Sequence, residues 1–177
     1  MEPRQWIVNA YTLAFAALLL SVGSLSDRVG RRRIFAAGVA VFTLASLACA
    51  LAPSAGFLIV SRAAQGTGGA LVMGTALALI AAAYDGAPAR ARNTAIGLFA
   101  AAALGPLVGG AVVDGWGWRY IFVLNLPLGV TILAGTWLRL TESKAKAGGR
   151  LDTAGLILGA LLLFSLNYAL LNGPMDG

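Results

Sequence analysis

The chain has 177 residues, of which 59% are hydrophobic and only 11% charged, and it contains one cysteine and no histidine. Soluble domains carry about 25% charged residues, so this composition excludes an ordinary water-soluble domain and indicates that lipid covers most of the surface. The net charge of +6 comes from clusters of Lys and Arg between apolar runs, which indicates membrane topology rather than nucleic-acid binding.

Six apolar segments follow one another along the chain. A helix needs about 20 residues to cross a hydrocarbon core of about 30 Å. Segments of about this length, rich in Leu and Ala, cover residues 6–26, 34–52, 57–83, 94–113, 120–138 and 153–172. Proline, glycine and charged residues separate them. The sequence therefore predicts an all-α polytopic membrane protein with six transmembrane helices.

The loops between these segments differ in charge. Loops 27–33, 84–93 and 139–152 hold ten Lys and Arg residues, whereas the opposite side holds only Arg4 and Arg119. Basic loops stay in the cytoplasm, so we predict that these three loops are cytoplasmic and that both termini are extracytoplasmic. The composition favours a bacterial inner membrane.

The first basic loop combines arginines with two glycines and an aspartate, namely Gly23, Asp27, Arg28, Gly30, Arg31, Arg32 and Arg33. Gly23 lacks a side chain and allows close packing, and Gly30 permits a tight reversal of the chain. Asp27 is placed to pair with an arginine or to cap a helix N-terminus. A topology signal explains the arginines but not the glycines and the aspartate, which favours a specific role for this loop.

The third predicted helix carries a charged residue near its outer end. By their spacing, Arg62, Gln65, Gly66 and Gly69 share one face of this helix. Burying a guanidinium in a membrane costs about 2.5–3.5 kcal/mol. The face therefore either lines a wet cavity or lets Arg62 reach the outer headgroups. Gln65 extends the polar face one turn further in, which favours the cavity.

The fourth predicted helix contains a cluster of small residues with a proline, namely Gly105, Pro106, Gly109 and Gly110. The step from Gly105 to Gly109 permits close contact with another helix. Pro106 is expected to bend the helix and to free the carbonyl of Ala102. Packing alone explains these residues about as well as a role in transport coupling does.

Three ordered motifs resemble signatures of the major facilitator superfamily. Residues 23–33 match its loop pattern G-x-x-x-D-R-x-G-R-R-R at every position, and residues 62–68 resemble its motif R-x-x-Q-G-x-G. Residues 105–110 resemble the antiporter motif G-P-x-x-G-G. Residues 118–127 are similar to the start of the family's sixth helix, and residues 151–155 to the seventh helix of its fourteen-helix drug:proton antiporters.

The resemblance implies a proton-coupled efflux transporter for multiple drugs or other small molecules. It would work by alternating access and draw on the proton gradient, with no bound cofactor. It also implies that loop 23–33 holds two helical bundles together on the cytoplasmic side. The Arg62 face would line the cavity and respond to protons, and residues 105–110 would support antiport. The expected partners are the lipid bilayer, an amphipathic small molecule, protons and a C-terminal transporter bundle, without nucleic acid.

The resemblance divides the chain into a partial N-terminal bundle over residues 1–139 and a cytoplasmic linker with an extra helix over residues 140–177. The family's first helix, which supplies a membrane carboxylate, is missing. The segment before Gly105, residues 98–104, is more than one helical turn shorter than the corresponding segment of the family's fifth helix. No predicted span has an interior Asp or Glu, and proton coupling needs a group that titrates near pH 7. The chain alone is therefore predicted to be an inactive fragment.

Two other functions are compatible with the sequence. One is a facilitator or uptake transporter for a metabolite, since a fold does not decide the substrate, although the motif at 105–110 argues against it. The other is a non-transporting membrane scaffold or assembly partner. An intramembrane enzyme would need a Ser–His pair or a metal cluster, and a chain without histidine or interior carboxylates offers neither.

Overall fold

The computed structural model describes residues 3–86, 88–100 and 105–142, together with residues 157–159, 161–162, 165 and 168–169. The regular structure of these residues is helical throughout. The helices are α1 (Pro3–Val29), α2 (Arg31–Ala50), α3 (Ala55–Ala83), α4 (Ala89–Ala100), α5 (Gly105–Trp116) and α6 (Arg119–Arg139). The all-α fold expected from the sequence is therefore observed.

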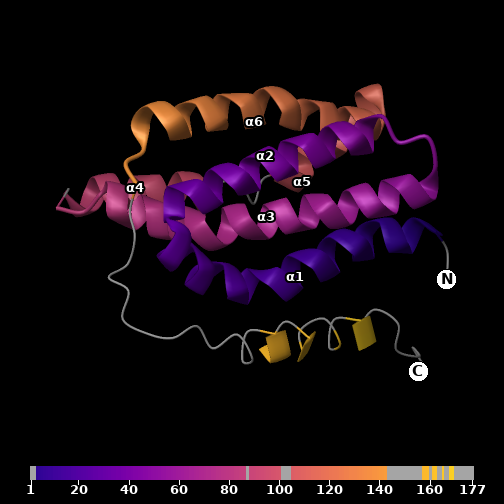
Figure 1. Cartoon of the computed structure of the whole chain (residues 1–177). Helices are drawn as coiled ribbons and strands as arrows, with labels where there is room; N and C mark the ends of the chain where they lie inside the picture. Colours follow the sequence, from indigo (N-terminus) through magenta and orange to yellow (C-terminus); the bar gives the residue numbers. More distant parts are fainter. Residues whose placement is uncertain are drawn as a thin grey trace, which may run out of the picture.

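Helix α3 lies in the middle of the bundle. It packs against α1 on one side and α2 on the other, and α2 in turn packs against α6 (Figure 1). Glycines make the contact between α2 and α3 close: a Cβ atom added at Gly68 would lie 2.5 Å from the backbone nitrogen of Phe42, and one at Gly38 would lie 2.7 Å from Cβ of Leu71. The two backbones can approach this closely because neither glycine has a side chain.

Local residues determine where α3 begins. Pro53 lies in the turn that follows α2, where no backbone N–H is needed. Ser54 then takes an extended conformation as the N-cap, and its hydroxyl accepts the backbone N–H of Phe57 at 3.3 Å. Such a cap satisfies one of the free N–H groups at a helix start. The α2–α3 turn, residues 51–54, is short and carries no charge.

Three described helices are long and apolar enough to cross a membrane: α2, α3 and α6, with mean hydropathies of 1.8, 1.7 and 1.8. Helix α1 adds a fourth if its two arms, Gln5–Leu19 and Ser21–Val29, which are bent by 57°, form one span. These four helices correspond to the predictions for 6–26, 34–52, 57–83 and 120–138. Of the predicted helix 153–172, most residues lie outside the described part of the chain.

The predicted helix 94–113 differs from the structure. Helical residues begin earlier, at Ala89, and end later, at Trp116, in two described helices of 12 residues each, α4 and α5. Residues 101–104, between them, lie outside the described residues. The start was predicted too late because Arg90 and Arg92 were assigned to a loop, whereas arginine is a good helix former.

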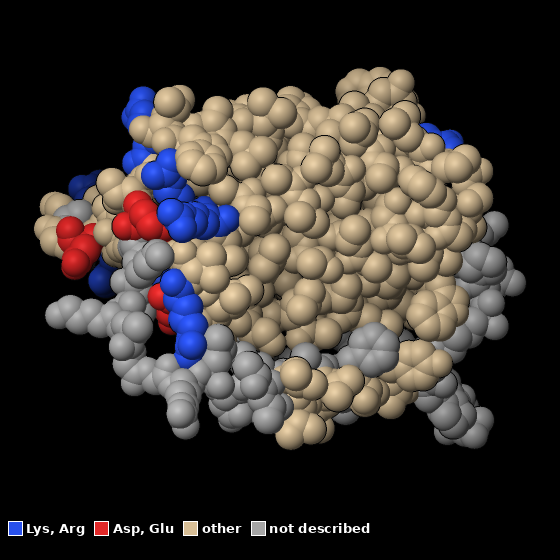
Figure 2. All heavy atoms as spheres, in the orientation of Figure 1, with Lys and Arg blue, Asp and Glu red and all other residues tan. Residues whose placement is uncertain are grey.

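Charged side chains gather at one end of the bundle. This is the end at which α2 begins and α6 ends, and the broad side of the visible face carries almost none (Figures 1 and 2). At the opposite end, Nη2 of Arg119 donates to the carbonyl of Ala52 at 3.2 Å, which ties the start of α6 to the end of α2. The structure thus has the charge asymmetry along its helices that the loop sequences predict.

Candidate functional site

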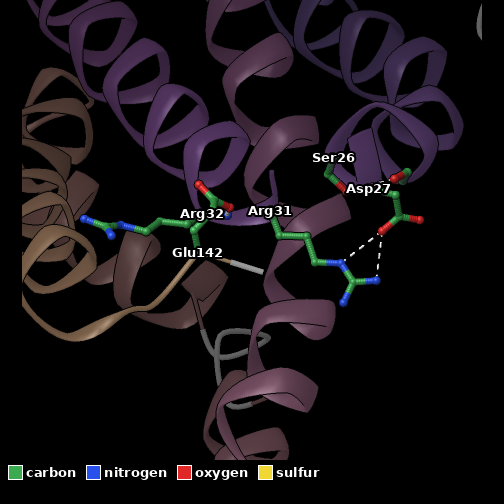
Figure 3. A network of polar contacts seen from close by, with 6 residues as sticks. Ser26, Asp27, Arg31, Arg32 and Glu142 are labelled. Atoms are coloured by element: carbon green, nitrogen blue, oxygen red, sulfur yellow. Dashed lines mark hydrogen bonds and ion pairs between the residues drawn. The ribbon is translucent and has the colours of Figure 1, made fainter. Parts of the chain in front are cut away.

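Residues 27–33, which comprise the end of α1, Gly30 and the start of α2, are called the arginine turn below. The prediction that Gly30 makes the reversal is confirmed by its φ of 122°, a conformation that residues with side chains rarely adopt. Asp27 accepts hydrogen bonds from Nε and Nη2 of Arg31, at 3.0 and 2.8 Å (Figure 3). Both side chains are partly exposed, so this ion pair contributes at most about 1 kcal/mol. Of its two predicted roles, Asp27 takes the pairing role.

A second carboxylate, which the sequence analysis did not single out, caps α2. Glu142 follows α6, and its Oε1 accepts the backbone N–H of Arg32 at 3.2 Å. Its Oε2 lies 3.6 Å from Nε of Arg33. A Cβ atom at Gly30 would lie 2.5 Å from the Glu142 carboxylate, so the missing side chain makes room for it. A negative charge near the N-terminus of α2 interacts favourably with the helix dipole.

The consecutive arginines of the turn point in opposite directions. Arg31 points toward Asp27, whereas Arg32 points toward α6 (Figure 3). The Arg32 guanidinium donates from Nη2 to the carbonyl of Trp137 at 3.1 Å and lies 4.7 Å from the centre of the Trp137 ring. Its buried Nε has no hydrogen-bond partner among the described residues. The arginine turn is thus fixed to α1 through one arginine and to α6 through the next.

A polar cluster of buried and half-buried side chains connects α1, α2, α3 and α6 and consists of Tyr11, Ser46, Arg62, Gln65 and Asn125. The Arg62 guanidinium donates from Nε to the carbonyl of Ile7 at 3.2 Å and from Nη1 to Oε1 of Gln65 at 2.6 Å. It also lies 4.4 Å from the centre of the Tyr11 ring, a cation–π contact. Arg62 therefore binds α1 through the Ile7 carbonyl and the Tyr11 ring, and Gln65 of its own helix through Nη1.

The polar cluster continues from Arg62 into α2 and α6. Nε2 of Gln65 donates to Oγ of Ser46 at 2.7 Å, and Nδ2 of Asn125 donates to the same oxygen at 3.3 Å. Gln65 is 1% exposed and Ser46 fully buried. Sequence reasoning missed Ser46 because a serine in a helix can satisfy its hydroxyl on its own backbone, so one serine in an apolar span is no signal.

The other residues of the predicted Arg62 face serve as contact surfaces. A Cβ atom added at Gly66 would collide with the carbonyl oxygen of Tyr11, and one at Gly69 would lie 3.0 Å from the Tyr11 hydroxyl. Both glycines therefore let α1 approach α3. Arg62, Gly66 and Gly69 thus lie against Tyr11 of α1, whereas Gln65 binds Arg62 and Ser46.

An open cavity of about 270 Å³ is found at the end of the bundle where the α2–α3 turn and the start of α6 meet. Its lining includes Ala52, Leu58, Trp118, Arg119 and Ile7, whose carbonyl accepts from Arg62. No group of three His, Cys, Asp or Glu side chains that could hold a metal ion occurs in the part of the chain that the structure describes.

The glycines of the predicted antiporter motif lie at the beginning and middle of α5. A Cβ atom at Gly105, Gly109 or Gly110 would meet no other described atom within 4 Å. Among residues 3–86, 88–100 and 105–142, the structure therefore gives no helix partner for the predicted close contact. Pro106 is the second described residue of α5. Ala102, whose carbonyl was expected to be freed, lies outside the described residues.

The sequence matches the profile of the Major Facilitator Superfamily over residues 5–175. The chain belongs to this superfamily. It is therefore an integral membrane protein from a family of transporters, not an enzyme. The arginine turn and the polar cluster around Arg62 contain some of the residues that carry the family resemblance in the sequence.

The curated relatives of this superfamily member include several resistance and export proteins. It is 43% identical to multidrug resistance protein Stp of Mycobacterium tuberculosis over 98% of this chain and 33% of Stp. It is 41% identical to the methylenomycin A resistance protein of Streptomyces coelicolor, over 97% of this chain and 37% of that protein. With the tetracenomycin C resistance and export protein of Streptomyces glaucescens the identity is 36%, over 98% and 33% of the two chains. The chain thus spans about a third of the length of these relatives.

Proposed function

We propose that this chain forms part of an efflux transporter that exports amphipathic small molecules, including antibiotics, in exchange for protons. The observation that carries the proposal is a guanidinium, that of Arg62, held inside a bundle of membrane-spanning helices. A charged group in a membrane is costly and marks a functional pathway by default. The similarity to resistance and export proteins over 97–98% of the chain supports the choice of exported compounds.

The proposed roles of the parts follow from their positions. The end that carries the arginine turn faces the cytoplasm of a bacterium, because basic loops are retained on that side, and both termini are extracytoplasmic. There the turn contacts a second helical bundle and stabilises one of the alternating conformations. The Arg62 face borders the transport cavity, and residues Gly105–Gly110 support coupling to the proton gradient. No bound cofactor takes part.

The chain requires a second bundle to transport. Alternating access needs two bundles that move about a site at the middle of the membrane. Proton coupling needs a buried carboxylate or a histidine. The chain has no histidine, and the acidic residues that the structure describes, Asp27, Asp85, Asp114 and Glu142, lie at helix ends or between helices. We propose that the remaining two thirds of a transporter of the relatives' size supply these groups.

A chimera tests this function. The 177 residues replace the matching segment of Stp, and the chimera is produced in a bacterial strain that lacks its own drug pumps. Export of a fluorescent cation from the cells is expected, and an ionophore that collapses the pH gradient is expected to abolish it. The unfused chain, reconstituted in liposomes, is the matched control and is expected to give no flux.

Three results would contradict the proposal. A chimera that is inserted in the membrane at normal level but exports nothing would argue against efflux. A flux that survives the loss of the pH gradient would favour a facilitator. Export by the unfused chain would show that a second bundle is not needed.

A further inference from the structure

The hydroxyl of Ser46 uses its full hydrogen-bonding capacity. It donates to the carbonyl of Phe42 at 2.8 Å. It accepts from Nε2 of Gln65 at 2.7 Å and from Nδ2 of Asn125 at 3.3 Å. A serine hydroxyl has one proton to donate and two lone pairs that accept. Ser46 therefore has no proton left with which to bind an oxygen of Gln65.

This arrangement determines which way the Gln65 amide points. With its nitrogen at Ser46, its oxygen lies 2.6 Å from Nη1 of Arg62. A reversed amide would place its oxygen at a hydroxyl without a free proton, and its NH₂ group at a guanidinium that can only donate. Because Gln65 is 1% exposed, these unpaired groups would find no water. The reversed amide is thus unfavourable at both of its ends.

We propose that Ser46 is a positioning residue for Arg62. Its hydroxyl orients the Gln65 amide, whose oxygen then holds the guanidinium inside the bundle. Asn125 binds the same hydroxyl, so α6 helps to keep it in place. The inference rests on the proposed function only in giving Arg62 a part in export, and the orientation of the side chains can be measured without any transport.

The reactivity of Arg62 toward phenylglyoxal tests the proposal. The full 177-residue chain is placed in lipid nanodiscs, and peptide mass spectrometry measures the modification rate of Arg62 relative to that of Arg90, which is exposed. Ser46→Ala removes the acceptor and is expected to raise this ratio about tenfold, the factor for one lost hydrogen bond of a charged group. Ser46→Cys keeps the volume and a weak acceptor, so its ratio is expected to lie between those of wild type and Ser46→Ala.

Ser61→Ala is the matched control. Ser61 is also buried, and its hydroxyl donates to a backbone carbonyl one turn earlier, that of Phe57, at 2.9 Å. Its replacement removes a buried hydroxyl of the same kind and is expected to leave the ratio at the wild-type value. A rise as large as that of Ser46→Ala would show that any buried hydroxyl has this effect, and the proposal would be wrong.

A double-mutant cycle shows whether Ser46 acts through Gln65. In the Gln65→Leu chain Arg62 has already lost its acceptor, so adding Ser46→Ala is expected to change the ratio less than about twofold. An unchanged ratio in Ser46→Ala, or an equal rise with and without Gln65, overturns the proposal. Failure of the unmutated Stp chimera to export would instead overturn the proposed function, and would leave the labelling result as it stands.

Discussion

The carboxylate of Glu142 accepts the backbone N–H of Arg32 across 110 residues of sequence and thereby caps the N-terminus of α2. Helix α2 begins in the arginine turn, directly after Gly30, and its N-cap residue has no side chain that could do this. The cap therefore comes from the segment after α6. This contact connects the first loop motif of the chain to the segment that leads out of the described bundle.

Loss of this cap is expected to destabilise the bundle. Glu142→Ala removes a hydrogen bond to the helix N-terminus and a favourable charge at its dipole, so the free energy of unfolding should fall by about 1 kcal/mol. Asp85→Ala is the control, because Asp85 is an exposed carboxylate in the turn after α3. Thermal unfolding in nanodiscs measures both. Equal effects of the two substitutions would show that Glu142 does not act as a cap.

Gly30→Ala is expected to cost about 1–3 kcal/mol of stability, because alanine is strained at a φ of 122°. Its Cβ would also displace the Glu142 carboxylate. Gly86→Ala provides the comparison, since Gly86 has a φ of 75° but open space at its Cβ position. The difference between the two unfolding free energies contains the displacement of Glu142 and the larger backbone strain at φ 122°. It should shrink when both substitutions are made in a Glu142→Ala chain, and an unchanged difference there would contradict the contact.

Two glycine substitutions in helices are expected to have effects of opposite sign. Gly68→Ala places a methyl group 2.5 Å from the Phe42 nitrogen, so α2 and α3 must move apart. Overpacking of this kind lowers the free energy of unfolding by about 1–3 kcal/mol. Gly135→Ala in α6 meets no described atom within 4 Å and should stabilise the helix by up to about 1 kcal/mol. Unfolding midpoints of the two variants in nanodiscs check the signs. Destabilisation by both would argue against the open surface at Gly135.

Arg62→Lys tests whether Arg62 acts through its hydrogen bonds inside the bundle or is only attracted to lipid headgroups. Lysine keeps the positive charge but lacks the planar fork that reaches the Ile7 carbonyl and Gln65 together. Export by the Stp chimera is expected to fall at least about tenfold, the factor for one lost hydrogen bond of a charged group. Arg119→Lys is the control, because Arg119 is exposed at the end of the bundle opposite the arginine turn. Full export by Arg62→Lys would favour the headgroup interpretation.

Thiol labelling tests the proposed orientation of the charged end. Cys49 is fully buried and is replaced by alanine first. Asp85→Cys lies near the charged end and Ser54→Cys in the uncharged α2–α3 turn, and both positions are exposed. A membrane-impermeant maleimide added to intact spheroplasts is expected to label position 54, and to label position 85 only after lysis. The reverse pattern would invert the topology.

Residues whose properties are local were predicted well from the sequence. The reversal at Gly30 follows from a conformation that glycine tolerates, and the four observed long helices follow from apolar length. The shared face of Arg62 and Gln65 follows from helical spacing. Each of these inferences needs only neighbouring residues, and helix geometry supplies the rest.

Contacts between distant residues could not be predicted in this way. Glu142 was one carboxylate in a basic loop, and no pattern near it indicates the start of α2. Ser46 and Asn125 share a hydrogen bond only because α2 and α6 pack at the right height, which depends on the glycines and small residues between them. The beginning of α4 was missed for a different reason, since two arginines were taken as a loop signal.

The contact of Glu142 with α2 also has a mechanical consequence. The chain leaves α6 at Arg139 and reaches the first turn of α2 three residues later. A force on the chain beyond residue 142 therefore acts on the first turn of α2, next to Gly30, through the Glu142 contact. It does not have to pass along the length of α6 to reach α2. A pull from that side would strain the beginning of α2 before it loosened the middle of the bundle.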